Sequence, residues 1–344
     1  MLDLFAPQVE RDKMHHNFLT IVEEPYPFAR NLIQSWANGF QDRDNKFVKE
    51  FQTTFNSSFW ELYLFSVFKK YGFLIDFSKD SPDFVITKPY EISVEAVISN
   101  NAKNSIPEYE RKIDLKNIPN KEEIVRTATI RLANAILYKY KNKYLESYSQ
   151  KEYVGDKPFI LAVAPFEQPF FWEQTNCAIN HVLYGLKGFE FRNPNNRIAT
   201  EVTKCILEPF IEKDNGAEIQ LGFFADTQMQ EVSAVLFSNV ATFGKVRALT
   251  KNEDPRNMLF AFSKFNAKDV HPCTGILPKQ LYSESLESGL CLYLNPFAKY
   301  PLPDDFVKLF PSWCTFDFEM KMPLGDSKDG ELLDRMVNVI EIKM

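Results

Sequence analysis

The sequence of 344 residues contains only 12 glycines and lacks the glycine-rich loops that bind nucleotides. Neither a GxxxxGK(S/T) phosphate loop nor a GxGxxG turn occurs, and no GxSxG nucleophile elbow is present. No apolar stretch approaches the roughly 20 residues that a membrane-spanning helix needs. These absences exclude the common nucleotide-binding and serine-hydrolase motifs and predict a soluble protein.

Cysteine is also sparse, and no two cysteines form a CxxC pair. The five cysteines are Cys177, Cys205, Cys273, Cys291 and Cys314. Their odd number and wide spacing predict buried thiols, without a disulfide framework or a zinc site. The N-terminal residues MLDLFAPQVERDKMHH lack the basic start and the apolar core of a secretory signal. We therefore expect a cytoplasmic protein.

The chain has no overall positive charge; its formal net charge is −6. This argues against a protein that coats nucleic acid by bulk attraction, because that mode needs a strongly basic surface. Residues 103–143 differ, since they carry ten lysines and arginines against five acidic residues. Any contact with nucleic acid is expected in this region.

The periodicity predicts an α/β protein, with a mixed sheet flanked by helices. We expect a helical cap over residues 1–55, a core over 56–166 and an α/β extension over 167–344, within one continuous domain. The core is expected to begin with a buried helix over 57–71, which Ser57 or Ser58 caps and which ends at Gly72. Three strands are expected next, over 73–77, 83–87 and 91–97. A long helix over 121–148 and a strand over 157–165 should complete the core.

The remaining segments are less regular. The polar stretch 99–120 has no clear pattern and is long for a loop, so we interpret it as a loop on the substrate side. A further helix is expected over 170–186. Further strands that widen the sheet or form a second layer are expected at 218–224, 232–238, 258–263 and 289–297.

Three carboxylates lie in apolar surroundings, where an isolated charge is costly. Glu61 is the only acid in FWELYLFSVF, Asp83 opens a strand after Pro82, and Glu95 lies inside ISVEAV. Two strands joined by a short turn can place Asp83 beside Glu95. These carboxylates and the backbone carbonyl of Ala96 would make an oxygen-only site suited to Mg²⁺ or Mn²⁺. A metal ion there could promote phosphodiester hydrolysis.

The order of these residues resembles the PD-(D/E)xK nuclease superfamily, which has a restriction-endonuclease-like core. Several segments are similar to a family of uncharacterised bacterial proteins with that core: FWELYLFSVFKKYGF, SPDF, VEAV, RLANAILYK, KPFILAVA, SAVLFS and NPFAKYPLP. The resemblance implies that Asp83 and Glu95 bind the metal and that Glu61 supports it. The implied activity is a Mg²⁺-dependent nuclease, acting on DNA in preference to RNA.

The sequence departs from that pattern at Val97, where the superfamily usually has the lysine that orients or deprotonates the attacking water. Helical periodicity places Lys139 and Lys143 on the apolar stripe of the helix over 121–148. Lys139 follows RLANAI, where the similar family also carries lysine, and we therefore expect it to supply the missing amine.

Other interpretations of these residues are open. Ser58 and Glu61 also fit a capping box, and Lys139 and Lys143 could simply snorkel beside a helix end. Phe170, Phe171 and Trp172 could stack on bases or pack a core.

The alternatives to a nuclease are an inactive nuclease-fold protein that binds nucleic acid or a protein partner, and a complex-forming protein with a phenylalanine-rich surface. A homodimer is one option for the oligomeric state. The expected nucleic-acid contacts are Lys103, Arg111, Lys112, Arg126, Arg131 and Lys143.

Overall fold

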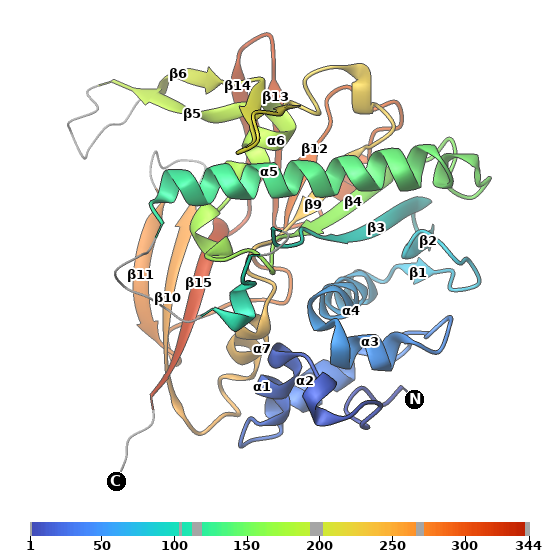
Figure 1. Cartoon of the computed structure of the whole chain (residues 1–344), viewed down its shortest axis with the longest axis vertical. Coiled ribbons are helices and arrows are strands. Elements are labelled where there is room, and N and C mark those ends of the chain that lie inside the picture. Colours follow the sequence, from blue (N-terminus) through green and yellow to red (C-terminus); the bar gives the residue numbers. More distant parts are fainter. Residues whose placement is uncertain (1, 103–104, 112–118, 193–201, 266–271, 341–344) are drawn as a thin grey trace.

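An eight-stranded mixed sheet runs through the centre of the molecule (Figure 1). The computed structural model describes residues 2–102, 105–111, 119–192, 202–265 and 272–340. The strands of the sheet are, in spatial order, β1 (Leu74–Ile75), β2 (Phe84–Lys88), β3 (Ile92–Ile98), β4 (Phe159–Ala164), β9 (Ala234–Phe237), β12 (Cys291–Leu294), β13 (Ser312–Asp317) and β14 (Met322–Ser327). The expected α/β class with a mixed sheet is confirmed.

The first half of the sheet follows the chain. Strands β1, β2 and β3 form the expected antiparallel meander. Strands β3, β4 and β9 run parallel to one another, and helix α5 (Lys121–Lys139) lies in the crossover from β3 to β4. The three parallel strands therefore end at the same edge of the sheet.

The strands are buried on both faces. On β4, Ile160 and Ala162 belong to the core that packs against α4 (Phe55–Lys70), whereas Leu161 and Val163 belong to the core under α5. Figure 1 shows α4 and α5 on opposite sides of the sheet, with α6 (Cys177–Tyr184) on the α5 side. Side chains that alternate along a strand consequently reach different helical layers.

Helix α4 is buried around most of its circumference. The indole Nε1 of Trp60 donates a hydrogen bond to the carbonyl of Ala162 at 2.9 Å, which ties the helix to the middle of the sheet. The helix ends as expected at Gly72, whose φ of +75° suits glycine. Its amide donates to the carbonyl of Lys69, and the amide of Phe73 donates to that of Phe68, closing a Schellman motif.

The expected start of α4 is wrong. The helix begins at Phe55, its N-cap residue Thr54 makes no side-chain cap, and Ser58 is buried inside the first turns. Glu61 is therefore not part of a capping box. The ring of Phe55 lies 5.1 Å from those of both Phe51 and Phe59, and this aromatic packing accounts for the earlier start.

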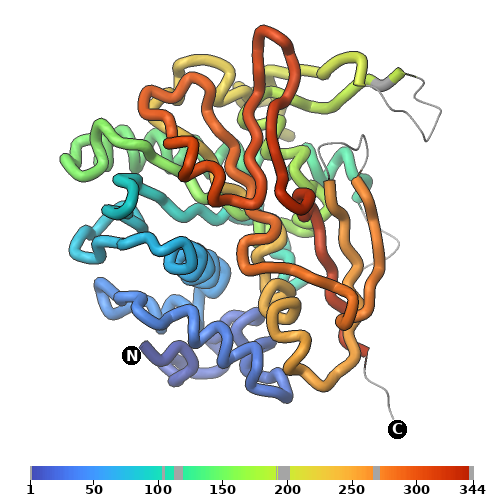
Figure 2. Tube along the Cα trace, turned by 180° about the vertical axis from the view of Figure 1, so that it is seen from behind, coloured from blue at the N-terminus to red at the C-terminus, as the bar shows by residue number. Residues whose placement is uncertain are grey.

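The helical cap expected at the N-terminus is present. It contains α1 (His16–Val22), α2 (Phe28–Trp36) and α3 (Phe47–Thr53). In Figures 1 and 2 these helices lie beyond α4, on the side away from the sheet. They bury the outer face of α4 in the same hydrophobic core.

The helix expected over 121–148 is interrupted. Its α-helical part ends at Lys139, and a π-helical turn follows over Tyr140–Leu145. Since a π turn changes the number of residues per turn, the expected stripe does not continue to Lys143. The buried side chains beyond the junction are Tyr140, Tyr144 and Tyr148.

The C-terminal half both widens the central sheet and adds a second layer. Strands β10 (Asn257–Phe265), β11 (Cys273–Pro278) and β15 (Glu331–Ile340) form a separate antiparallel sheet. The other elements are the hairpins β5 (Leu186–Phe191) with β6 (Val202–Leu207) and β7 (Phe210–Glu212) with β8 (Glu218–Gln220), and helices α7 (Phe243–Thr250) and α8 (Asp304–Val307). No helix in the described part of the chain is both long enough and apolar enough to span a bilayer.

Candidate functional site

Two of the expected acids meet across the first strands of the sheet. Phe84 of β2 pairs with Val94 of β3, so the same register carried one residue further places Asp83 opposite Glu95. The backbone amide of Ala96 donates a hydrogen bond to Asp83 Oδ2 at 2.7 Å. Because directly opposite residues point to the same face of a sheet, the two carboxylates share one location.

Lys139 reaches this location from the last turn of α5. Its Nζ lies 2.6 Å from Glu95 Oε1, and the Glu95 side chain is only 4% exposed. The hydroxyl of Tyr148 donates a second hydrogen bond to Glu95 Oε1 at 3.2 Å. One carboxylate oxygen of Glu95 is therefore bound by the Lys139 ammonium and the Tyr148 hydroxyl, and both residues follow β3 in the sequence.

The other oxygen of Glu95 is buried and has no hydrogen-bond partner within the described residues. A buried, unpartnered carboxylate oxygen is costly, and its presence calls for a counterpart such as water or an ion. Asp83 is the neighbouring acid that could share such a counterpart.

The charge state of the pair depends on its burial. Burial and the nearby Glu95 carboxylate raise the pKa of Asp83 to about 7, although Lys139 acts in the opposite direction. Burial alone would lower the pKa of the Lys139 ammonium, but Glu95 and Asp83 outweigh this effect and the pKa is raised. Lys139 therefore stays protonated at neutral pH, while Asp83 changes charge near it.

Glu61 approaches the pair from α4. Burial raises the pKa of Glu61 well above its usual value, and the charges of Asp83 and Glu95 add to this effect. All four expected catalytic residues are thus electrostatically linked: Glu61, Asp83, Glu95 and Lys139.

Two further residues at this site were missed by the sequence analysis. Arg43 donates to the carbonyl of Lys79 at 2.7 Å, and its charge lowers the pKa of both Glu61 and Asp83. It lies in a polar turn without any periodic pattern, so nothing in the sequence indicated it. Tyr148 could have been found, since Tyr140, Tyr144 and Tyr148 recur at a spacing of four residues.

The expected nucleic-acid contacts are spread along the chain. Arg111 is paired with Glu108, and Arg126 is paired with Asp214. Arg131 is half-buried on α5 with Nε unpartnered within the described residues. Lys143 lies in the π-helical turn and is half-buried. Lys103 and Lys112 lie outside the described residues.

Few side chains at this site could bind a metal ion, and all of them would do so through oxygen atoms. Among the described residues, no three or more His, Cys, Asp or Glu side chains are gathered closely enough to hold a metal ion. The remaining possibility is a two-carboxylate site of Asp83 and Glu95 with the Ala96 carbonyl, completed by water. The unpartnered oxygen of Glu95 and the raised pKa of Asp83 both fit a pair of carboxylates that can bind a cation. Mg²⁺ commonly binds through one or two carboxylates and keeps several waters.

Comparisons with known proteins add no assignment: no family model, no curated protein and no solved structure matches this chain.

Proposed function

We propose that the protein is a Mg²⁺-dependent nuclease with a restriction-endonuclease-like core that hydrolyses phosphodiester bonds, in DNA rather than RNA. The observation that carries this proposal is the meeting of Asp83, Glu95 and Lys139, which come from two adjacent strands and a distant helix. Two acids on adjacent strands and one amine from a helix form the residue set of the PD-(D/E)xK pattern that the sequence resembles.

The position of the amine supports this interpretation. Val97, which stands where the pattern has lysine, is only 3% exposed and packs in the core under α5. Lys139 approaches Glu95 from that same helical layer. An amine from α5 can therefore replace the amine that the strand lacks.

Each residue has a chemical role in this proposal. Asp83 and Glu95 would hold the ion, and Glu61 would support the ion or its water. A bound Mg²⁺ would lower the pKa of a water molecule and neutralise charge on the phosphate. Lys139, protonated because of its raised pKa, would orient the attacking water and stabilise the developing phosphate charge without acting as the base.

The proposal is tested by cleavage of a mixed panel of single- and double-stranded DNA and RNA in Mg²⁺ or Mn²⁺. Wild type should cut at least one DNA substrate, and Glu95→Ala should lose activity by at least about a hundredfold, because a metal ligand is lost. Glu91→Ala is the matched control, since Glu91 is exposed just before β3 and forms an ion pair with Lys157. Identical behaviour of wild type and Glu95→Ala on every substrate would refute the nuclease.

Metal binding should also raise the thermal stability of the protein. We expect Mn²⁺ to raise the melting temperature of wild type at pH 8, with about 2.7 kcal/mol of added stability when the ion is at 100 times its dissociation constant. Glu95→Gln should show little of this shift, because it keeps the shape but removes a charged ligand. Differential scanning calorimetry in EDTA and in Mn²⁺ measures the effect, and an equal shift in both proteins would exclude this site as the binding site.

A second candidate function is an inactive nuclease-fold protein that binds nucleic acid or a protein partner. The ion pair of Lys139 and Glu95 favours it, because the pair neutralises much of the buried charge without a metal ion. For this alternative, the same panel would show DNA or RNA binding without cleavage, and Mn²⁺ would leave the melting temperature unchanged.

A further inference from the structure

A cavity of about 900 Å³ lies beyond the carboxyl ends of the parallel strands β4 and β9. Phe166 and Asn239 line it, and they follow the last residues of β4 and β9 by two positions. Residues of α1, α7 and β15 close the other sides. Its size suits a small molecule, and the edge formed by strand carboxyl ends is where open α/β sheets commonly bind ligands.

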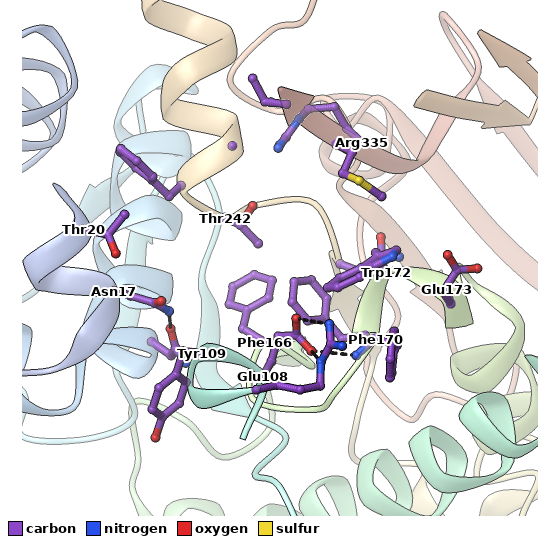
Figure 3. A pocket seen from close by; sticks show the side chains of 18 of the residues that line it. Asn17, Thr20, Glu108, Tyr109, Phe166, Phe170, Trp172, Glu173, Thr242 and Arg335 are labelled. Carbon is purple, nitrogen blue, oxygen red and sulfur yellow. Dashed lines mark hydrogen bonds and ion pairs between the residues drawn. The ribbon is translucent and has the colours of Figure 1, made fainter. Parts of the chain in front are cut away.

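The wall of the cavity that follows β4 is aromatic. It carries Phe166, Phe170, Phe171 and Trp172 (Figure 3). The guanidinium of Arg111 lies over the ring of Phe170, with Cζ 3.8 Å from the ring centroid. Flat aromatic and guanidinium surfaces are the groups on which proteins stack bases.

This arrangement is fixed by its surroundings. Both oxygens of Glu108 accept hydrogen bonds from Arg111 at 3.0 Å, and Glu108 Oε2 also accepts one from the Phe170 amide at 2.8 Å. Phe170 has a φ of +56°, which is unfavourable for a bulky residue. Thr175, at the end of the same segment, has a φ of +50°. Strained backbone of this kind tends to occur at functional sites.

The lining also carries more positive than negative charge. Arg111, Lys121, Arg247 and Arg335 line the cavity, against Glu108 and Glu173. Three of these cations are ion-paired: Arg111 with Glu108, Arg247 with Glu24, and the buried Arg335 with Glu284. Figure 3 shows Arg335 and Trp172 facing the cavity on the side opposite Asn17 and Thr20.

Arg335 needs the glycine at position 244. A Cβ atom there would lie 1.9 Å from its Nη1. The buried Glu284 accepts a hydrogen bond from Arg335 Nε at 3.1 Å. The guanidinium is thus held in place at the cavity wall.

From the aromatic wall and the partly exposed arginines, we infer that this cavity binds a nucleotide, with its base against the Phe170 and Trp172 wall and its phosphate near Arg111 and Arg247. The nucleotide is either a free mononucleotide or one unit of a single strand. The cavity is separate from the Asp83 site: Lys121 lies at its rim, and α5 rises about 27 Å between Lys121 and Lys139. This inference does not depend on the nuclease activity.

Calorimetric titration tests it in EDTA, with AMP, ribose 5-phosphate and a single-stranded oligoadenylate as probes. The Glu95→Gln protein is used, so that cleavage cannot interfere. AMP or the oligoadenylate should bind at one site, and ribose 5-phosphate should bind at least tenfold more weakly because it has no base. Tighter binding of AMP identifies a free nucleotide as the ligand, and tighter binding of the oligoadenylate identifies a strand.

Substitutions in the cavity wall test where the nucleotide binds. Trp172→Ala should weaken it about tenfold to a hundredfold, the range that loss of one stacking ring produces, and Trp172→Phe should restore most of the affinity. Phe210→Ala is the matched control, because Phe210 is an exposed aromatic of β7 outside the cavity. Absence of binding by both AMP and the oligoadenylate, equal binding of AMP and ribose 5-phosphate, or unchanged affinity in Trp172→Ala would overturn the inference.

Discussion

Lys139→Met is expected to reduce cleavage by about a hundredfold to a thousandfold, the range seen when one positioned donor to the developing charge is removed. Within the described part of the chain, Lys139 is the cation that forms an ion pair with Glu95. Methionine keeps an unbranched side chain that is one atom shorter, and it removes the charge and the hydrogen bonds. Initial rates on the best DNA substrate of the panel measure the effect.

The same substitution should lower the free energy of unfolding by about 3 kcal/mol in EDTA, because a nearly buried Glu95 would lose its partner. Mn²⁺ should recover part of this loss by supplying positive charge. Lys141→Met is the matched control, since Lys141 is exposed in the π-helical turn. Lys143→Met tests the other candidate amine, four residues beyond Lys139. If Lys143→Met lost activity and Lys139→Met did not, the assignment of the amine would be wrong.

Asp83→Asn is expected to abolish cleavage and yet to stabilise the metal-free protein at pH 8. Burial and Glu95 raise the pKa of Asp83 from its ordinary value of 3.8 to about 7. The folded state therefore binds a proton between these values that the unfolded state has released. Wild type loses this stabilisation as the pH rises from about 4 to above 7, whereas asparagine is neutral throughout and can still accept from the Ala96 amide.

The gain in Asp83→Asn should be on the order of 2 to 4 kcal/mol at pH 8 and should vanish near pH 4, since a shift of one pKa unit corresponds to about 1.4 kcal/mol. Denaturant unfolding in EDTA at pH 4, 6 and 8 measures it. Saturating Mn²⁺ at pH 8 should reduce the difference, because only wild type retains both ligands. A stability difference that does not change with pH would contradict the buried charge at Asp83.

Local patterns were sufficient to predict the acidic pair. The short turn between two alternating strands left few registers that would keep Val94 and Phe84 in the core, and the structure has the register that places Asp83 opposite Glu95. Helical periodicity likewise predicted that Lys139 faces the sheet. Both inferences depended on residues close in sequence or on a regular repeat.

Features that depend on distant packing could not be predicted in this way. The start of α4 at Phe55 depends on Phe51 of another helix, and the π-helical turn after Lys139 has no sequence pattern that distinguishes it from α-helix. Arg43 reaches the site from the N-terminal cap. The nucleotide cavity joins α1, α7 and β15, whose positions follow only from the tertiary fold.

The buried acids of the site lower the stability of the folded protein. The raised pKa values of Asp83 and Glu61 show that burial opposes their negative charge. A protein selected for stability alone would replace such acids with apolar residues. Several buried acids around one lysine fit the metal site proposed above, in line with the general trade-off between stability and activity.

The central claim is that Asp83 and Glu95 hold one divalent ion beside Lys139. It is tested most directly by an anomalous difference map from crystals of the protein soaked in Mn²⁺. The account predicts a single strong peak bounded by the two carboxylates and the Ala96 carbonyl, which disappears in crystals of Glu95→Gln. A map with no peak there, or with its only peaks elsewhere, would contradict the account.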